Sequence, residues 1–69
     1  MTVYKIKGDY YSRQAWMHLG KAREAKRHLR GESDGWTLMV IRGTVRDQAY
    51  FARQSLKLAI MYRQIDGRL

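Results

Sequence analysis

The chain has 69 residues with 14 Lys and Arg against 6 Asp and Glu, a formal net charge of +8, and neither cysteine nor proline. This length predicts one small domain, 1–69, and the lack of cysteine excludes a disulfide framework or a thiolate metal site. An apolar content of 45% is too high for a disordered tail, while the charge favours a polyanionic partner.

The N-terminal stretch reads as a strand followed by a short connection. Residues 2–7 alternate between apolar and basic side chains, which predicts a half-buried strand. Gly8 would end this strand, Tyr10 and Tyr11 would lie in the connection, and Ser12 would cap the first helix. No continuous apolar run of the kind found in a signal peptide occurs here.

Residues 13–30 have the periodicity of a helix. Gly31 follows at the position where a left-handed C-terminal cap is expected. The predicted core-facing stripe consists of Ala15, Leu19, Ala22, Ala25 and Leu29.

A second strand and a second helix are predicted in the remaining sequence. Residues 31–35 form a polar turn, and residues 36–42 are an apolar run typical of a strand buried on both faces. Gly43 would end that strand. Thr44, with an Asp three residues later, resembles a capping box for a helix that runs to about residue 65.

The predicted element order is therefore β-α-β-α. Two parallel strands joined through a helix give an α/β (or α+β) domain of two layers, with a right-handed crossover. A two-stranded sheet is too small to be stable alone. We therefore expect the sheet to be completed by dimerisation.

The second predicted helix has an unusually wide apolar surface. Its two adjacent apolar stripes cover more than half of the circumference, which exceeds the stripe of about 100° needed by a surface helix. This width predicts a homodimer. A monomer whose first helix and sheet clasp the second helix is the alternative. The predicted self-association residues are Phe51, Leu58, Tyr62 and Trp36.

A stripe on the first helix carries the main functional signal. Trp16, Gly20, Arg23, Arg27 and Arg30 follow at steps of 4, 3, 4 and 3, so they share one side of a helix. Arg binds phosphate as a fork, and an aromatic ring can stack on a base. We therefore predict a non-enzymatic nucleic-acid-binding module that contacts RNA or DNA. The candidate residues are Trp16, Arg23, Arg27, Arg30, Lys21, Lys26, Arg13, Tyr10 and Tyr11.

Two other interpretations remain open. The stripe could be an ordinary solvated helix face, since long basic side chains often cover apolar surface. Alternatively, the chain could be an adaptor or inhibitor that docks its basic face on an acidic surface of a larger, nucleic-acid-processing protein.

The sequence predicts no catalytic set, metal or cofactor. His18 and His28 would lie about 15 Å apart along one helix, too far to share a metal. The chain also lacks an apolar run of the roughly 20 residues that a membrane helix needs, so we expect a cytoplasmic protein with no membrane partner.

Overall fold

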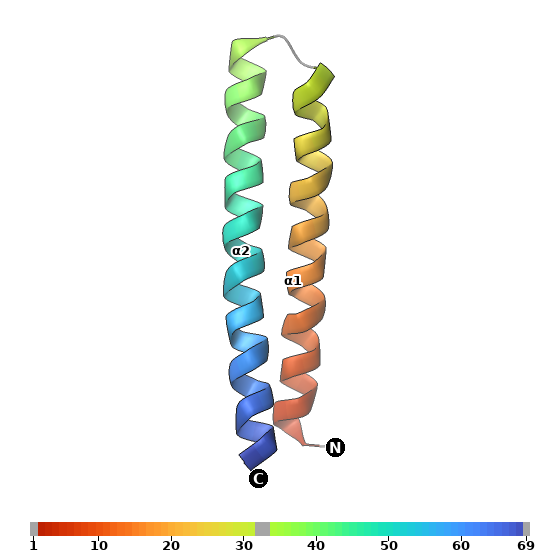
Figure 1. Cartoon of the computed structure of the whole chain (residues 1–69), viewed down its shortest axis with the longest axis vertical. Coiled ribbons are helices and arrows are strands. Elements are labelled where there is room, and N and C mark those ends of the chain that lie inside the picture. The colour runs from red at the N-terminus through yellow and green to blue at the C-terminus, as the bar shows by residue number, and fades with distance from the viewer. Residues whose placement is uncertain (1, 32–33, 69) are drawn as a thin grey trace.

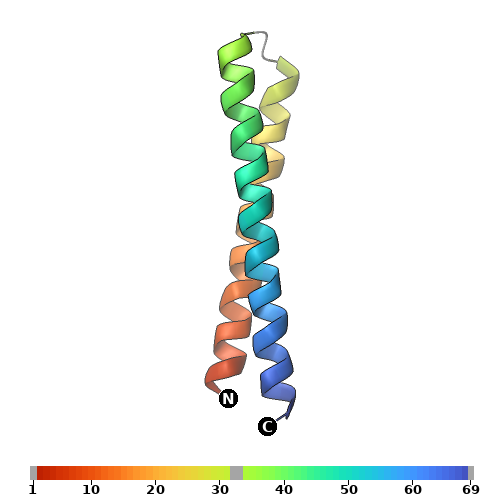
Figure 2. The same cartoon turned by 90° about the vertical axis from the view of Figure 1, so that its left-hand side faces the viewer.

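The computed structural model describes residues 2–31 and 34–68 and shows an antiparallel helical hairpin (Figure 1). Helix α1 spans Val3–His28 and continues into a short 3₁₀ turn, η1, over Leu29–Gly31. Helix α2 spans Gly35–Arg68 and crosses α1 at a shallow angle (Figure 2). The Cα atoms extend over 53 × 13 × 12 Å, and their radius of gyration is 15.7 Å. A compact chain of this length would have a radius of about 11 Å, so the molecule is a thin rod.

The predicted β-α-β-α order is wrong, because the described residues contain no strand. Residues 2–7 form the N-cap and the first turns of α1, and residues 36–42 belong to the start of α2. Gly8 and Gly43, which were expected to end strands, both lie inside helices. The predicted α/β architecture is thus replaced by a two-helix hairpin, and there is no sheet in the described residues for a dimer to complete.

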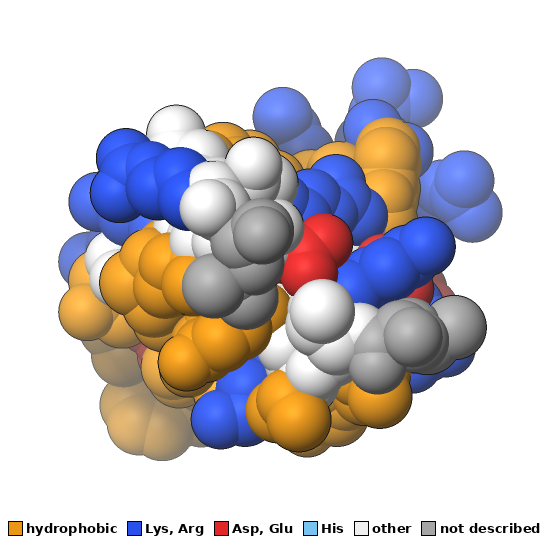
Figure 3. All heavy atoms as spheres, turned by 90° about the horizontal axis from the view of Figure 1, so that it is seen from below, with side chains coloured by type: hydrophobic (Ala, Val, Ile, Leu, Met, Phe, Trp, Pro, Cys, Tyr) orange, Lys and Arg blue, Asp and Glu red, His pale blue; other side chains and the backbone are white. Residues whose placement is uncertain are grey.

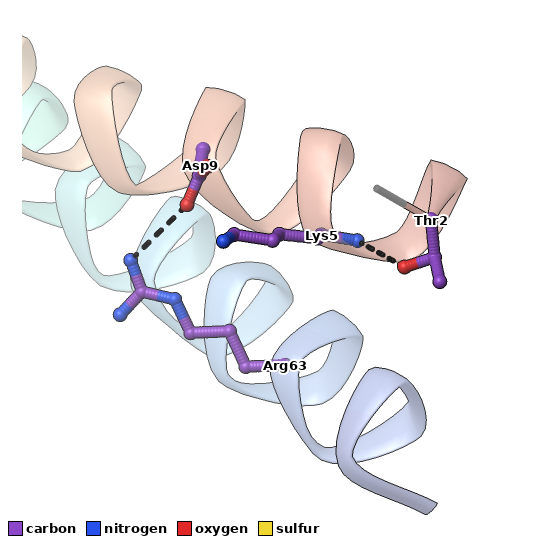
Figure 4. Close-up of polar contacts among 4 residues, drawn as sticks. All are labelled: Thr2, Lys5, Asp9 and Arg63. Atoms are coloured by element: carbon purple, nitrogen blue, oxygen red, sulfur yellow. Dashed lines mark hydrogen bonds and ion pairs between the residues drawn. The ribbon is translucent and has the colours of Figure 1, made fainter. Parts of the chain in front are cut away.

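The helices begin at N-caps that the sequence analysis did not choose. The hydroxyl of Thr2 accepts a hydrogen bond from the backbone N–H of Lys5 at 3.1 Å (Figure 4). The carboxylate of Asp34 accepts one from the backbone N–H of Thr37 at 2.9 Å, and a second from the Thr37 hydroxyl at 2.8 Å. These two hydrogen bonds hold the pKa of Asp34 below its ordinary value, and the bond from the backbone N–H has the larger effect. Both caps satisfy backbone donors that the first helical turn leaves unpaired.

The predicted caps lie elsewhere. Ser12 is inside α1, and the hydroxyl of Thr44 donates to the carbonyl oxygen of Val40 at 3.1 Å, inside α2. Gly31 ends η1, but the left-handed cap predicted there is wrong. No described glycine, Gly31 included, has a positive φ. The turn predicted at 31–35 includes two residues, 32 and 33, that lie outside the described part of the chain.

The two helices meet along a seam of residues that, apart from the exposed Tyr4, are buried or half-buried and that recur at steps of 4 and 3. This spacing averages 3.5 residues and is the repeat of a left-handed coiled coil. Small side chains are frequent in the seam, so the helices can approach closely. The seam residues are Tyr4, Gly8, Tyr11, Ala15, His18, Ala22, Ala25 and Leu29 on α1, and Leu38, Ile41, Val45, Gln48, Ala52, Ser55, Ala59, Tyr62 and Asp66 on α2.

Close approach is clearest at Gly8, near the end of the rod that carries both termini. A Cβ atom at Gly8 would lie 3.2 Å from Cγ of Arg63 and 3.6 Å from the carbonyl oxygen of Ala59. The Arg63 guanidinium lies 3.8 Å from the carboxylate of Asp9 (Figure 4). Both side chains of this ion pair are about half exposed, so we expect it to contribute at most about 1 kcal/mol.

Tyrosine rings fill the seam near the termini. The Tyr62 ring stacks on Tyr11 with centroids 5.8 Å apart and 7° between the planes, and on Tyr4 at 6.3 Å and 23°. The ammonium of Lys7 lies 5.4 Å from the centroid of the Tyr62 ring. Tyr62 was predicted to serve in self-association, but these contacts place its ring between the two helices of one hairpin.

The seam buries few side chains. Among the described residues only Gly8, Ala22 and Ala59 are buried, and two of these three are alanines. By contrast, Trp16 and Trp36 are 67% and 70% exposed. The large apolar side chains that would fill the core of a compact domain therefore lie mostly on the outside of the rod.

Candidate functional site

The seam divides the rod into two long faces, and one of them carries an apolar groove beside Trp16. We call this hollow of about 330 Å³ the Trp16 groove. Both helices contribute to it, because their small seam residues leave space between the larger flanking side chains. The residues that line it are Ser12, Ala15, Trp16, Leu19, Ala49, Ala52, Arg53 and Leu56.

A second hollow follows on α1, toward the end of the rod opposite the termini. It measures about 330 Å³ and is lined by Arg23, Lys26, Arg27 and Arg30. We call it the cationic hollow, and all four side chains are exposed. Three of them are the arginines of the predicted stripe. The structure thus places these three arginines and Lys26 around one space.

The cationic hollow follows from helical geometry. Residues at i, i+3, i+4 and i+7 share one side of a helix, and Arg23, Lys26, Arg27 and Arg30 have this spacing. Lys26 and Arg27 lie in the last turn of α1, where positive charge complements the partial negative charge of the helix end. This favourable position offsets part of the repulsion among four neighbouring cations.

Of the described residues, those that line the cationic hollow include no acidic side chain. Among the described residues, the one ion pair within 4 Å joins Asp9 to Arg63, near the other end of the rod. Glu24 directly follows Arg23 in the sequence, but it lines a different hollow together with Lys21 and His28. In the part of the chain that the structure describes, no acidic side chain therefore lies within 4 Å of these four cations as an ion pair.

Trp16 lies on the same face as the cationic hollow. It precedes Arg23 by seven residues, which is two helical turns or about 10.5 Å along the axis. Its ring is exposed and flanked by Arg53 from α2. This cationic face therefore combines a ring that can stack on a flat group with a cluster of guanidinium groups further along the rod.

Several predicted binding residues lie away from the cationic face. Lys21 lines a hollow on the opposite side of the seam, with Thr44 of α2. Tyr11 is half-buried in the seam, while Tyr10 is exposed and contacts the Tyr11 ring edge-on at 5.1 Å. Arg13 is exposed and lines neither the Trp16 groove nor the cationic hollow. Only part of the predicted set is therefore brought together.

The sequence analysis missed the contribution of α2 to the cationic face. Arg53 and Leu56 line the Trp16 groove, and Arg42 and Arg46 line a further hollow on the outer side of α2. A signal was present, since these residues recur at helical spacing. It was lost because Arg42 was assigned to a strand.

The other predicted self-association residues are spread over α2. Phe51 is 46% exposed and lies 5.5 Å, between ring centroids, from His18. Leu58 follows two turns later and is half-buried. Trp36 is exposed in the first turn of α2, far from both along the helix. Phe51 and Leu58 share a side of α2 that faces away from the cationic face.

Three further findings concern metal binding, membrane spanning and similarity to known proteins. Among the described residues, no group of three His, Cys, Asp or Glu side chains could hold a metal ion. In the same part of the chain, neither helix is apolar enough over a sufficient length to cross a membrane. Comparison with protein-family models, curated proteins and solved structures finds no match.

Proposed function

We propose that this chain is a non-enzymatic nucleic-acid-binding module whose cationic face contacts the phosphate backbone. The observation that carries the proposal is the cationic hollow, where four exposed cations surround one space whose lining, in the described part of the chain, has no acidic residue. Guanidinium groups bind phosphate through paired hydrogen bonds, and clustered cations release counterions from a polyanion on binding. Both effects are independent of base sequence.

Trp16 favours nucleic acid over other polyanions. Its exposed ring is available for stacking, and each stacked base adds on the order of 1–3 kcal/mol in proteins that bind single strands. From Trp16 to Arg30 the face extends over fourteen residues, or about 21 Å. This length is sufficient to follow several phosphates of one strand. The proposal includes a homodimer as the working unit and the cytoplasm as its location.

Fluorescence anisotropy with short RNA, single-stranded DNA and duplex DNA tests the proposal. Binding should weaken steeply with salt, because most of the affinity would come from counterion release. Replacing Arg23, Arg27 and Arg30 with Ala should lower the slope of log K against log salt by about 2.7 for duplex DNA, or about 2.1 for a single strand.

The control variant removes the same charge from the other half of the rod. Lys5, Lys57 and Arg68 are exposed and lie outside the cationic hollow, so their replacement with Ala should change affinity much less. Equal losses in the two variants would show that net charge, rather than the hollow, drives binding. Absence of binding at low salt would overturn the proposal. A stoichiometric acidic protein recovered from nuclease-treated lysate would then favour the adaptor interpretation.

A further inference from the structure

The face opposite the cationic face carries large apolar side chains from both helices, which we call the apolar strip. Viewed along the rod from the end with the termini, hydrophobic side chains form one group at the lower left and one at the bottom, with a Lys or Arg side chain between the two groups (Figure 3). The strip extends over the half of the rod nearer the termini. It consists of Val3, Ile6, Tyr10 and Met17 on α1 and Phe51, Leu58, Met61 and Ile65 on α2.

The spacing within the apolar strip is that of a second helix-packing seam. On α2, Phe51, Leu58 and Ile65 follow at intervals of seven residues, with Met61 between the last two. The strip residues of α1 also follow at steps of 3, 4 and 7. A seven-residue apolar repeat keeps one side of a helix directed at a neighbouring helix. Each helix thus has one such repeat inside the hairpin and a second one directed outward.

The outward repeat remains largely exposed. Val3, Ile6 and Tyr10 are 62%, 52% and 50% exposed, and Phe51 and Met61 are 46% and 42% exposed. An apolar row of this length exceeds the scattered single apolar residues that are normal on protein surfaces. It therefore requires a covering partner.

The exposed area of the whole hairpin can be compared with the area that a protein interface buries. The hairpin exposes 5562 Å². A compact monomer of 8.2 kDa would expose about 4,500 Å², so the excess is about 1,000 Å² per chain. A stable protein–protein interface buries about 800 Å² per partner, and obligate dimers bury more. This excess, which belongs to the hairpin as a whole, is as large as the area that one copy buries in a stable interface.

We infer that a second copy of this chain covers the apolar strip, so that two hairpins form a four-helix bundle. A two-fold interface requires a surface that is complementary to itself, and the apolar side chains of one copy can pack against the same side chains of the other. The cationic face points away from the strip and remains open in such a dimer. The inference does not depend on nucleic-acid binding, since the strip and the cationic hollow have no residue in common.

Analytical ultracentrifugation of the full chain without nucleic acid, at tens of micromolar and high salt, tests the dimer. The expected mass is twice 8.2 kDa, about 16.4 kDa. Thermal unfolding followed by circular dichroism should also shift to higher temperature as protein concentration rises, because association stabilises the folded state. A folded 8.2 kDa monomer with a concentration-independent midpoint would overturn the inference, whatever the outcome of the anisotropy titrations.

Two matched variants test which face is used. Phe51→Glu places a charge in the apolar strip, whereas Leu56→Glu places one on the same helix in the Trp16 groove. The exposed fractions of the two side chains are similar, at 46% and 50%. Phe51→Glu should yield a monomer or an unfolded chain, and Leu56→Glu should remain a dimer.

The remaining outcomes are equally decisive. A dimer that persists in Phe51→Glu would show that the apolar strip is not the interface. A dimer lost only in Leu56→Glu would assign the interface to the Trp16 groove and overturn the inference. Loss of folding in Phe51→Glu, together with a dimeric Leu56→Glu variant, supports the strip, because an obligate dimer has no stable monomer.

Discussion

The seam and the outer surface of this hairpin contrast sharply in side-chain size. The seam contains Gly8, Ala22 and Ala59, the buried residues of the described chain, while both tryptophans lie outside it. In most small domains the largest apolar residues are inside, since burying one contributes about 1.5–3 kcal/mol. Here the small residues of the seam permit close helix approach, and both tryptophans are left for contacts outside the hairpin.

The contrast indicates that different residues determine the hairpin and its interactions. A seam of small side chains gives two helices a register but buries little apolar area. The outer faces carry the Trp16 groove, the cationic hollow and the apolar strip, which provide surface for partners. Substitutions in the seam should therefore alter folding, whereas substitutions on the cationic face should alter binding.

The largest effect on folding is expected from Ala59→Leu. Ala59 is 1% exposed and lies beside Gly8, so three added carbons would force the helices apart. We expect a loss of about 1–3 kcal/mol in the free energy of unfolding, measured by urea denaturation. Ile60→Leu, at a neighbouring position that is 48% exposed, should change it by less than about 0.5 kcal/mol. A stable Ala59→Leu variant would contradict close packing at the seam.

The next effect concerns the cationic face and should appear in binding alone. Trp16→Ala should weaken binding to single-stranded nucleic acid by about 2 kcal/mol, or roughly 30-fold, if one base stacks on the ring. The unfolding midpoint should hardly change, because the ring is 67% exposed. Trp36→Ala removes a ring of similar exposure that lines neither the groove nor the cationic hollow, and anisotropy should show no loss. Equal losses from both variants would contradict a specific role for Trp16.

Alanine substitutions at two glycines of α1 allow the seam to be compared directly with the outer surface. A Cβ at Gly20 would meet nothing within 4 Å, so Gly20→Ala should stabilise the helix by about 1 kcal/mol. Gly8→Ala should gain less, because its Cβ would lie 3.2 Å from Cγ of Arg63, which must shift. Denaturant midpoints of the two variants measure the difference. A larger gain at Gly8 would contradict the helix register.

The smallest effect is expected at Asp34, the N-cap of α2. The hydrogen bonds from Thr37 lower its pKa, so the folded state favours the carboxylate. This stabilisation should be complete above the ordinary Asp pKa of about 3.9 and should be lost as pH falls through the lowered pKa. Asp34→Ala should therefore lower the melting temperature near neutral pH, and the difference from the unmodified chain should vanish in strong acid.

The helix over residues 13–30 and its arginine stripe could be predicted from the sequence, because each depends only on helical spacing. The structure has α1 and η1 over this range and brings Arg23, Arg27 and Arg30 around one hollow. The role of this hollow remains a prediction. The contribution of Arg53 could not be predicted, since it depends on the register between two helices.

The fold could not be predicted because two local patterns had more than one interpretation. Alternation over residues 2–7 is typical of a strand, but in the structure Tyr4 lies in the seam and Ile6 in the apolar strip. The apolar run over residues 36–42 suits either a buried strand or a helix with apolar residues on several sides. Gly8 and Gly43 were then interpreted as strand ends, and this interpretation supported the incorrect β-α-β-α order. Gly8 instead serves close helix packing, whereas nothing in the structure explains Gly43.

The opposite placement of the cationic face and the apolar strip has a consequence for a long polyanion. Two hairpins joined through the strip would direct their cationic hollows outward on opposite sides, so one dimer would be bivalent. Once one site is occupied, capture of a second segment of the same molecule depends on effective concentration rather than on a new encounter. Such a particle would loop or crosslink its partner, instead of holding a single stretch more tightly.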